Sequence, residues 1–159
     1  MELTLLIGIP GAGKSTFYRR RLAHTHYRVN LDTLKRRPRE LRVVQECIAE
    51  RRAFAVDNTN VLACDRARYI PLARAAGYKI VGYWFDCPVK DAQDRNSRRD
   101  GASWVPPHVI DSFHAKTEKP DYDEGFDNLF RVIIDGRWYV VKRMRRKPKP
   151  RARRDIEPA

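Results

Sequence analysis

The sequence predicts an α/β fold with three layers, in which helices cover both faces of a central, mostly parallel sheet. Short apolar runs alternate along the chain with stretches of helical periodicity, which is typical of parallel strands joined by helices. The first apolar run leads into a glycine-rich turn and then a helix without any breaker. A length of 159 residues suits one domain with an ample core. We expect this domain over residues 1–144, followed by a basic tail over residues 145–159.

Each element follows from a local signal. Leu41, Val44 and Ile48 recur at helical spacing, Gly77 closes the helix before it, and Asp135-Gly136 is a strong signal for a two-residue hairpin. We expect strands at residues 3–7, 27–30, 53–56, 79–85, 129–134 and 137–141. We expect a first helix that opens at residue 16 and three further helices over residues 39–52, 65–76 and 89–99. A last helix is expected from Pro106 or Pro107 to about Lys116. The carboxyl ends of the parallel strands then share one edge of the sheet, where functional groups gather in such folds.

The glycine-rich turn, Gly8-Ile9-Pro10-Gly11-Ala12-Gly13-Lys14-Ser15, fits the Walker A pattern G-x-x-x-x-G-K-[ST]. Its glycines allow the backbone N–H groups to wrap a triphosphate, and the following helix adds the positive end of its dipole. The lysine would reach the β- and γ-phosphates and the serine hydroxyl would ligate Mg²⁺. We therefore expect a site for ATP or another nucleoside triphosphate, contacted by Gly11, Ala12, Gly13, Lys14, Ser15 and Thr16.

Positive charge is concentrated at the end of the chain. The formal net charge is +13; the stretch from Arg137 onward holds ten Lys or Arg against two acidic residues, so it carries +8 and the rest of the chain +5. Such an excess favours contact with nucleic acid or another anionic surface. The alternative is a solvated tail that keeps the protein soluble. The Lys-Pro-Lys-Pro-Arg segment after Met144 lacks apolar residues to bury, so we expect the tail to be disordered.

Cysteines and apolar runs bear on the compartment. Cys47, Cys64 and Cys87 form neither a C-x-x-C pair nor an even disulfide set. No apolar run approaches the roughly 18 residues that a membrane span needs. The glycine-rich motif starts already at Gly8, which leaves no space for a secretion signal. We expect an intracellular, cytoplasmic protein without membrane contact.

Asp32 is the first candidate for catalysis, because it follows the second expected strand. A carboxylate at this edge, one loop away from bound phosphates, suits the removal of a proton from an acceptor hydroxyl and its orientation toward the γ-phosphate. The same spacing suits a helix N-cap, since Asp32-Thr33-Leu34 is also compatible with the first turn of a helix. The residues alone leave both interpretations open.

A polar run, Asp57-Asn58-Thr59-Asn60, follows the third expected strand. An acidic residue here suits a place near the water shell of a bound metal, and its polar neighbours suit hydrogen bonds to a substrate. The alternative is an Asx-type cap for the helix that starts near Asp65. We favour a functional role.

The segment Arg95-Asn96-Ser97-Arg98-Arg99 ends an expected helix just before a loop. Arginines on a mobile lid position phosphates and stabilise the charge that develops during transfer. Arg95 and Arg99 are four residues apart, so on one helix they share a face, and they are our candidate catalytic and nucleotide-binding pair. The alternative is structural, since cations near a helix C-terminus are favourable without any catalysis.

Several segments together resemble a known family. The Walker A motif, Val29-Asn30-Leu31-Asp32-Thr33-Leu34, Ala55-Val56-Asp57-Asn58-Thr59-Asn60, the lid arginines, Val105-Pro106 and Glu124-Gly125-Phe126 occur in the order and spacing of the 5′-hydroxyl polynucleotide kinase domain of DNA and RNA end-healing enzymes. The resemblance covers roughly residues 3–134. It implies a three-layer P-loop kinase fold with an Arg-bearing lid. It also implies transfer of the γ-phosphate of a nucleoside triphosphate, with Mg²⁺, to the 5′-OH end of DNA or RNA.

Matching positions imply a role for each candidate residue. The resemblance makes Asp32 the general base and assigns Lys14 and Ser15 to the phosphates and Mg²⁺. It makes Arg95 and Arg99 lid contacts to the donor phosphates, with Arg99 on the γ-phosphate. The candidate contacts to the acceptor end are Lys35, Asp57, Asn58, Thr59 and Val105.

The sequence departs from the family beside the candidate base. Leu31 stands where some members have Arg, and Lys35 where phage-type members have Arg. A lysine cannot make the bidentate phosphate contact of an arginine, which affects acceptor affinity and preference. The family often joins this kinase to a 3′-phosphatase domain that these residues lack, so a separate phosphatase or ligase is an expected partner. The tail has no counterpart in the family, and our hypothesis is that it adds nonspecific phosphate contacts.

Two other functions stay open from the sequence. One is a P-loop kinase of a small hydroxyl compound, such as a nucleoside or a sugar, which would be indifferent to the basic tail. The other is a nucleic-acid-binding protein that uses ATP only as a structural ligand, although the intact Lys14, Asp32 and Arg99 argue against it. The preference for DNA or RNA, the favoured triphosphate and the oligomeric state are also open.

Overall fold

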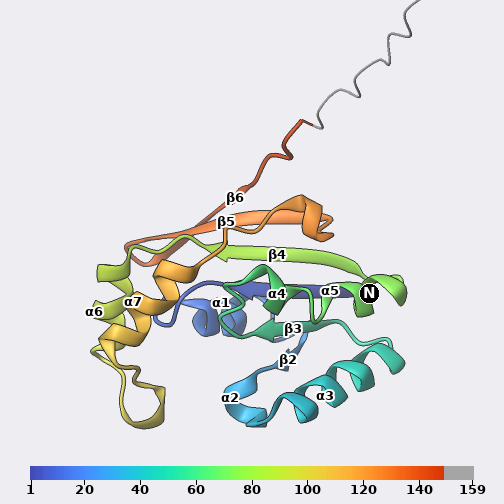
Figure 1. Ribbon diagram of the computed structural model, residues 1–159, viewed down its shortest axis with the longest axis horizontal. Helices are drawn as coiled ribbons and strands as arrows, with labels where there is room; N and C mark the ends of the chain where they lie inside the picture. The colour runs from blue at the N-terminus through green and yellow to red at the C-terminus, as the bar shows by residue number, and fades with distance from the viewer. Residues whose placement is uncertain (149–159) are drawn as a thin grey trace, which may run out of the picture.

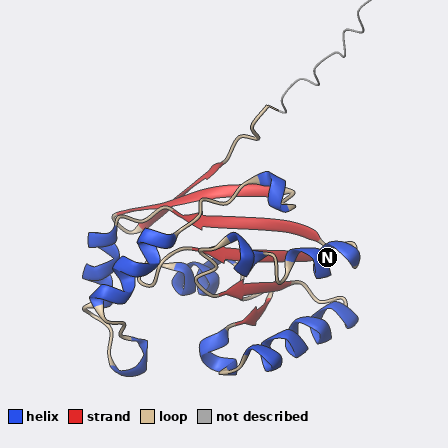
Figure 2. Cartoon of the chain, viewed as in Figure 1, coloured by secondary structure: helices blue, strands red, loops and turns tan. Residues whose placement is uncertain are grey.

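The computed structural model describes residues 1–148 and places them around one six-stranded sheet with helices on both sides (Figures 1 and 2). The strand order is β2-β3-β1-β4-β5-β6. Strands β1 to β5 run parallel to one another, and β6 runs antiparallel to β5. The expected three-layer α/β fold, with a mostly parallel sheet and a C-terminal hairpin, is confirmed.

Strands and helices alternate through the parallel part of the sheet. The strands are β1 (Glu2–Ile7), β2 (Tyr27–Val29), β3 (Phe54–Asp57), β4 (Lys79–Phe85), β5 (Asn128–Asp135) and β6 (Trp138–Arg143). The helices are α1 (Lys14–Arg21), α2 (Leu31–Leu34), α3 (Arg37–Ala49), α4 (Ala63–Arg66), α5 (Ile70–Ala75), α6 (Val89–Asn96) and α7 (Pro107–Lys116), with single 3₁₀ turns at η1 (Gly101–Ser103) and η2 (Tyr122–Glu124). In the described part of the chain, no helix combines the length and apolar character that crossing a membrane requires.

Each face of the sheet has its own apolar core. On one face, Leu5 of β1 belongs to a cluster with Val44 of α3 and Ala73 of α5. On the other face, Leu6 of β1 belongs to a cluster with Phe17 of α1 and with residues of α6 and α7. Consecutive residues of β1 therefore serve opposite cores. This is why the strand reads as a continuous apolar run rather than an alternating one.

The structure corrects the expected helix over residues 65–76, which is two short helices, α4 and α5. Pro71 gives the physical reason. Proline has no N–H, and its ring clashes with the carbonyl four residues earlier, so a helix does not continue through it. Pro71 lies instead in the first turn of α5. The end of α5 is as expected, with Gly77 at a φ of 77°.

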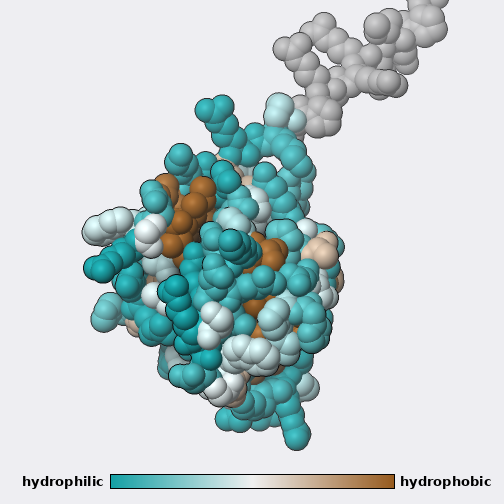
Figure 3. Space-filling view, turned by 90° about the vertical axis from the view of Figure 1, so that its left-hand side faces the viewer, coloured by the Kyte–Doolittle hydropathy of each residue, from teal (hydrophilic) through white to brown (hydrophobic). Residues whose placement is uncertain are grey.

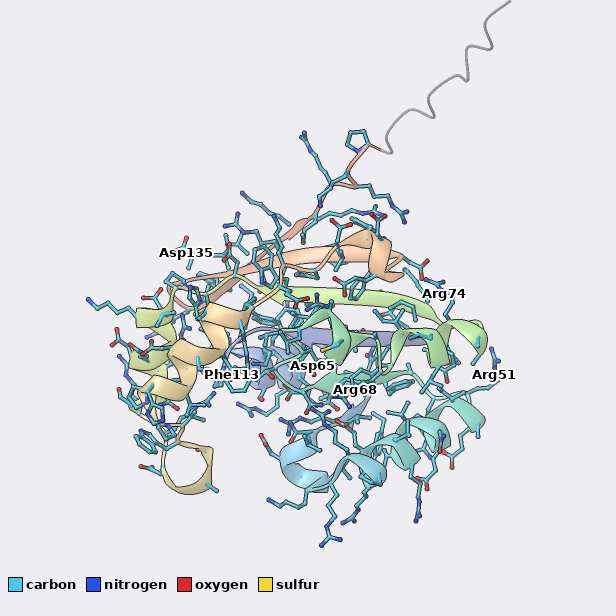
Figure 4. The ribbon with its side chains drawn as sticks, in the orientation of Figure 1. Arg51, Asp65, Arg68, Arg74, Phe113 and Asp135 are labelled. Atoms are coloured by element: carbon cyan, nitrogen blue, oxygen red, sulfur yellow. The ribbon has the colours of Figure 1, made fainter. Side chains whose placement is uncertain are left out.

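The expected two-residue hairpin is present but shifted by one residue. Asp135 pairs with Trp138, so the turn is Gly136-Arg137 rather than Asp135-Gly136. The φ of Gly136 is 57°, a value that glycine adopts without strain. Asp135 lies on the same side of the molecule as α6 and α7 (Figure 4), at the edge where the parallel strands end.

β6 carries the chain back to the opposite edge of the sheet. There, the amide of Met144 donates to the carbonyl of Leu129, near the start of β5, at 2.8 Å. The guanidinium of Arg146 lies 4.5 Å from the centre of the Tyr122 ring, so the first residues beyond β6 still contact the body of the domain. Disorder and nonspecific phosphate contacts were expected over residues 145–159, and residues 149–159 of this tail lie outside the described residues.

Candidate active site

The loop between β1 and α1 depends on its glycines. Gly11 and Gly13 have φ values of 82° and 94°, which side chains rarely tolerate. A Cβ at Gly11 would lie 2.3 Å from the carbonyl oxygen of Ala92 in α6, and one at Gly13 would lie 2.7 Å from a side chain of β5. No side chain caps the first amides of α1, which starts at Lys14. These amides are therefore available to an anion, as expected for a phosphate-binding loop.

Lys14 is the buried cation of this loop. Its ammonium donates to the carbonyl oxygens of Gly8 and Ile9 at 2.7 and 2.9 Å. Burial lowers the pKa of Lys14 to about 8; the charge of Asp57 opposes this shift and that of Arg99 adds to it. An ammonium has three protons, so one remains for a phosphate oxygen, whose negative charge would raise the pKa again.

Ser15 and Asp57 are the candidate ligands for a metal ion at this site. Asp57 ends β3 with its side chain 1% exposed, and its Oδ1 is buried without a hydrogen-bond partner among the described residues. A water bound to a cation would supply the missing donor. Hydroxyl and carboxylate oxygens are the ligands that Mg²⁺ prefers, so these residues fit the ion. Residues 1–148 contain no group of three or more His, Cys, Asp or Glu that could hold a metal. Mg²⁺ in proteins commonly keeps several waters and binds substrate phosphates beside one or two side chains.

Asp32 lies in the first turn of α2, and its side chain is exposed. The second expected strand ends earlier, at Val29, because Asn30 caps the helix: its Oδ1 accepts from the amide of Thr33 at 3.1 Å. The N-cap interpretation of Asp32 is therefore wrong, and its carboxylate makes no hydrogen bond or ion pair within residues 1–148. Asp32 follows β2 at the carboxyl edge of the parallel strands, the same edge that carries the phosphate-binding loop after β1.

Asn58 fixes the position of α2. Its Oδ1 accepts from the amide of Leu31 at 2.8 Å. Its Nδ2 donates to Glu40 at 2.6 Å and to the hydroxyl of Tyr69 at 3.3 Å. The amide of Asn58, a predicted acceptor contact, is thus bound to protein groups and holds the residue next to Asp32. This gives Asn58 a positioning role.

Asn58 is held by a hydrogen-bond network of Glu40, Arg37 and Tyr69 that was not predicted from the sequence. Glu40 is 2% exposed and accepts from Arg37 at 2.9 Å. Burial, and then the charge of Glu40, raise the pKa of Tyr69 to about 12, so its hydroxyl stays protonated. One signal was available: Glu40 lies at helical spacing from Val44 on the buried face of α3.

Two further predicted acceptor contacts, Lys35 and Thr59, have side chains that are exposed or partly exposed to solvent. Lys35 is exposed and ends α2 with a φ of 69°, a strained value for a residue other than glycine. The carbonyl of Thr59 accepts from the amide of Gly8 at 2.8 Å, which joins the loop after β3 to the phosphate-binding loop. Its partly exposed hydroxyl makes no hydrogen bond within the described residues.

The lid begins earlier than the sequence suggests. α6 ends at Asn96, so Arg95 and Arg99 do not share one helix face as expected. Asn96 is 1% exposed, and its amide both donates to and accepts from the backbone of Val105, at 2.6 and 3.0 Å. This pair of bonds turns the chain out of the helix and closes residues 97–104 into a loop. Asn96 was not among the predicted site residues.

The two lid arginines have different partners. Arg95 donates to the carbonyl of Gly11 at 3.0 Å and to the Sγ of Cys87 at 3.3 Å, so it lies against the phosphate-binding loop. Arg99 donates weakly to the carbonyl of Ser103 in its own loop, at 3.4 Å. Arg95 is therefore held at the site, whereas Arg99 depends on the conformation of the lid.

A cavity of about 480 Å³ lies between the phosphate-binding loop and the β5–β6 hairpin. Its lining includes Thr16 and Arg95 on one side and Trp138, which is 78% exposed, on the other. The hydroxyl of Tyr139 donates to the carbonyl of Gly13 at 2.9 Å and fixes the hairpin to the loop. An exposed aromatic face beside a phosphate site suits a nucleotide base. This contribution of the hairpin to the site was not predicted from the sequence.

The fold and the site together define a class of protein. A phosphate-binding loop follows β1, polar groups follow β2 and β3, and an arginine-bearing lid follows β4. All of them meet at the carboxyl ends of the parallel strands, a face that is mostly hydrophilic with a few apolar patches (Figure 3). This is the architecture of a P-loop kinase.

Residues 3–120 match the AAA domain family, and the chain belongs to this family. The bifunctional polynucleotide phosphatase/kinase of Schizosaccharomyces pombe is 27% identical over 135 residues, which are 82% of this chain and 33% of the relative. The putative bifunctional polynucleotide phosphatase/kinase of Acanthamoeba polyphaga mimivirus is 28% identical over 155 residues, 93% of this chain and 36% of the relative. The resemblance to polynucleotide kinases is thus confirmed, and the chain spans about a third of the length of these curated relatives.

Solved structures share the fold at low identity. Kti12 from Chaetomium thermophilum, in complex with ADP-AlF3, has a TM-score of 0.65 at 16% identity and covers 84% of this chain and 89% of its own. A gluconokinase from Sinorhizobium meliloti has a TM-score of 0.60 at 17% identity, with coverage of 83% and 82%. The APS kinase CysC of Mycobacterium tuberculosis, in complex with AMPPNP and APS, has a TM-score of 0.54 at 19% identity, with coverage of 84% and 88%. These likenesses confirm the P-loop kinase fold.

Proposed function

We propose that this domain transfers the γ-phosphate of ATP or another nucleoside triphosphate to the 5′-OH end of DNA or RNA, as a step in nucleic-acid end healing. One observation carries the proposal. The carboxylate of Asp32 is exposed, has no partner within residues 1–148, and follows β2 at the edge of the sheet that carries the phosphate-binding loop. An uncommitted carboxylate beside a phosphate-binding loop is what a general base for a hydroxyl acceptor requires. The names of the curated relatives support a polynucleotide as the acceptor.

The donor is held by the phosphate-binding loop and the lid. The amides at the start of α1 and the ammonium of Lys14 bind the phosphate oxygens, and Ser15 and Asp57 would hold Mg²⁺ directly and through water. When bound, the ion neutralises charge on the β- and γ-phosphates. Arg95 and Arg99 stabilise the charge that develops on the transferred group once the lid closes over it.

The acceptor meets the donor at Asp32. The carboxylate takes the proton of the 5′-OH while that oxygen forms a bond to the γ-phosphorus. The bond from the γ-phosphorus to the β–γ bridging oxygen breaks, and the nucleoside diphosphate leaves. Asn58 keeps α2, and with it Asp32, in register with the phosphate-binding loop.

The surface around Asp32 favours a polymeric acceptor. Four exposed cations follow it along α2 and α3, and none of them forms an ion pair within residues 1–148: Lys35, Arg36, Arg39 and Arg42. Such cations bind the phosphates of a nucleic-acid strand. A neutral sugar or nucleoside would gain nothing from them, so the surface argues against the small hydroxyl acceptor.

Transfer of label from γ-labelled ATP tests this proposal. The acceptors are 5′-OH DNA and RNA oligonucleotides, single nucleosides and gluconate. We expect label on the oligonucleotides, and a loss of about 10²- to 10⁴-fold in kcat for Asp32→Asn with an unchanged melting temperature. Asp123→Asn, an exposed carboxylate of η2, is the matched control and should stay fully active. Absence of label on every oligonucleotide would reject the acceptor, and full activity of Asp32→Asn would reject the base.

A further inference from the structure

Arg28 places a positive charge where the cation of a bound nucleotide belongs. It is the middle residue of β2, and its Nη2 donates to Ser15 Oγ at 3.2 Å and to Asp57 Oδ2 at 2.5 Å. Its Nε donates to the same Asp57 oxygen at 2.9 Å. One nitrogen thus lies between the two side chains that fit Mg²⁺. The transfer reaction proposed above gives this arginine no task.

The contact matters because Asp57 is buried. A carboxylate that is 1% exposed is strongly unfavourable without a cation at its side. The ammonium of Lys14 donates to loop carbonyls and not to this carboxylate. Among the described residues, Arg28 is therefore the cation that pairs directly with Asp57.

Arg28 also has a second position within reach. Its side chain is 35% exposed, and its guanidinium lies 5.5 Å from the centre of the Tyr18 ring. An open groove of about 560 Å³ lies beside it, lined by residues that include Tyr18, His26 and Arg52. A guanidinium that leaves Ser15 would keep a favourable cation–π contact with Tyr18, and the groove gives it room.

We propose that Arg28 is the resident cation of the metal site. It holds Ser15 and Asp57 together while Mg²⁺ is absent, and it moves toward Tyr18 when a metal–nucleotide complex binds. Mg²⁺ and Arg28 then compete for the same two oxygens, so Arg28 sets the Mg²⁺ concentration at which the site is occupied. The inference rests on the proposed function only in taking a Mg²⁺–nucleotide complex as the donor.

Mg²⁺ titrations of the full chain with saturating ADP test this inference, with the melting temperature as readout and EDTA as the starting point. We expect Arg28→Gln to melt at a lower temperature than the wild type in EDTA. We expect its Mg²⁺ midpoint to fall on the order of tenfold, because the competing charge is gone. Direct Mn²⁺ binding, measured by electron paramagnetic resonance, should shift in the same direction.

Arg52→Gln is the matched control. Arg52 lines the same groove and lies 5.6 Å from the centre of the Tyr27 ring, but it pairs with Glu50. Its Mg²⁺ midpoint should equal that of the wild type. Should Arg28→Gln fail to fold, Arg28→Lys replaces it: one ammonium bridges the two oxygens less well, so a smaller fall is expected.

A midpoint that stays the same or rises when Arg28 is replaced overturns the inference, and so does an equal fall in Arg52→Gln. ADP transfers no phosphate to a 5′-OH end, so these titrations do not involve the acceptor. Failure here would leave the proposed kinase reaction standing, and an absence of polynucleotide kinase activity would leave this result standing.

Discussion

The donor side and the acceptor side of the site are built in opposite ways. On the donor side, Lys14 is buried and bound to two carbonyls, and Gly11 fits against the backbone of Ala92. On the acceptor side, Asp32 and Lys35 are exposed and bound to nothing in the described residues. The donor side is thus organised before any ligand arrives, which is where electrostatic stabilisation is most effective. The acceptor side obtains its contacts from the substrate.

The largest effect is expected on the donor side, from replacement of Lys14. Lys14→Met should lower the rate of phosphoryl transfer by about 10³-fold, because the buried charge on the phosphates is lost. The nucleotide-free protein should melt at the same temperature or higher, since an apolar side chain is easier to bury than an ammonium. Labelled transfer and thermal unfolding check this, with Lys79→Met at the opposite edge as control. A rate within about tenfold of the wild type would remove Lys14 from the mechanism.

The second prediction concerns Asn58, whose hydrogen bonds hold α2 on the acceptor side. Asn58→Ala leaves the amide of Leu31 and the buried carboxylate of Glu40 without this partner, so the free energy of unfolding should fall by about 2 to 3 kcal/mol. Urea denaturation measures it. Asn128→Ala is the control, because Asn128 contacts the exposed Arg143. A loss below about 0.5 kcal/mol, usual for surface substitutions, would contradict the positioning role.

The third prediction concerns pH. Burial lowers the pKa of Lys14 to about 8 in the nucleotide-free protein, and bound phosphate would raise it. Below pH 8 the lysine is already protonated and affinity is level. Above pH 8 binding takes up a proton, so the affinity for ADP should fall by up to about tenfold per pH unit. Calorimetric titrations between about pH 7.5 and about pH 9.5 check this. The Lys14→Met variant should be level throughout, and a wild-type affinity that stays level would contradict the assignment.

The smallest effect is also expected on the donor side, where Trp138 would contact the base of the nucleotide. Trp138→Ala should raise the KM for ATP by about threefold to tenfold with little change in kcat, because base stacking adds ground-state binding. Trp138→Phe should restore most of it. Tyr27→Ala, another exposed aromatic residue, is the control in steady-state kinetics. An unchanged KM in Trp138→Ala would place the base elsewhere.

The donor side could be predicted because its signals are local. The spacing of Gly8, Gly11, Gly13 and Lys14 specifies one loop conformation, and a continuous apolar run before it specifies a strand buried on both faces. Pro71 was also a local signal, and it explains why the expected helix over residues 65–76 is two helices. Sequence patterns of a few residues were sufficient for the loop and the strand, whereas the break at Pro71 was not predicted although its signal was present.

The other contacts could not be predicted, because they join distant parts of the chain. Arg28 reaches Asp57 over 29 positions, and that contact depends on the parallel pairing of β2 with β3. Tyr139 reaches Gly13 over 126 positions, which depends on the β5–β6 hairpin. The sequence did predict the hairpin, but no pattern showed that β2 pairs with β3 or that the hairpin brings Tyr139 to Gly13. The strand register decides which side chains complete the site.

The dependence of kcat/KM on acceptor length is the most direct test of the proposed polynucleotide kinase reaction. The acceptors run from a single nucleoside to 5′-OH oligonucleotides of about ten nucleotides, at two salt concentrations. We expect kcat/KM to rise steeply with length and added salt to remove most of the rise, because exposed cations near Asp32 bind the strand. A nucleoside or sugar phosphorylated as efficiently as the longest oligonucleotide would contradict this expectation.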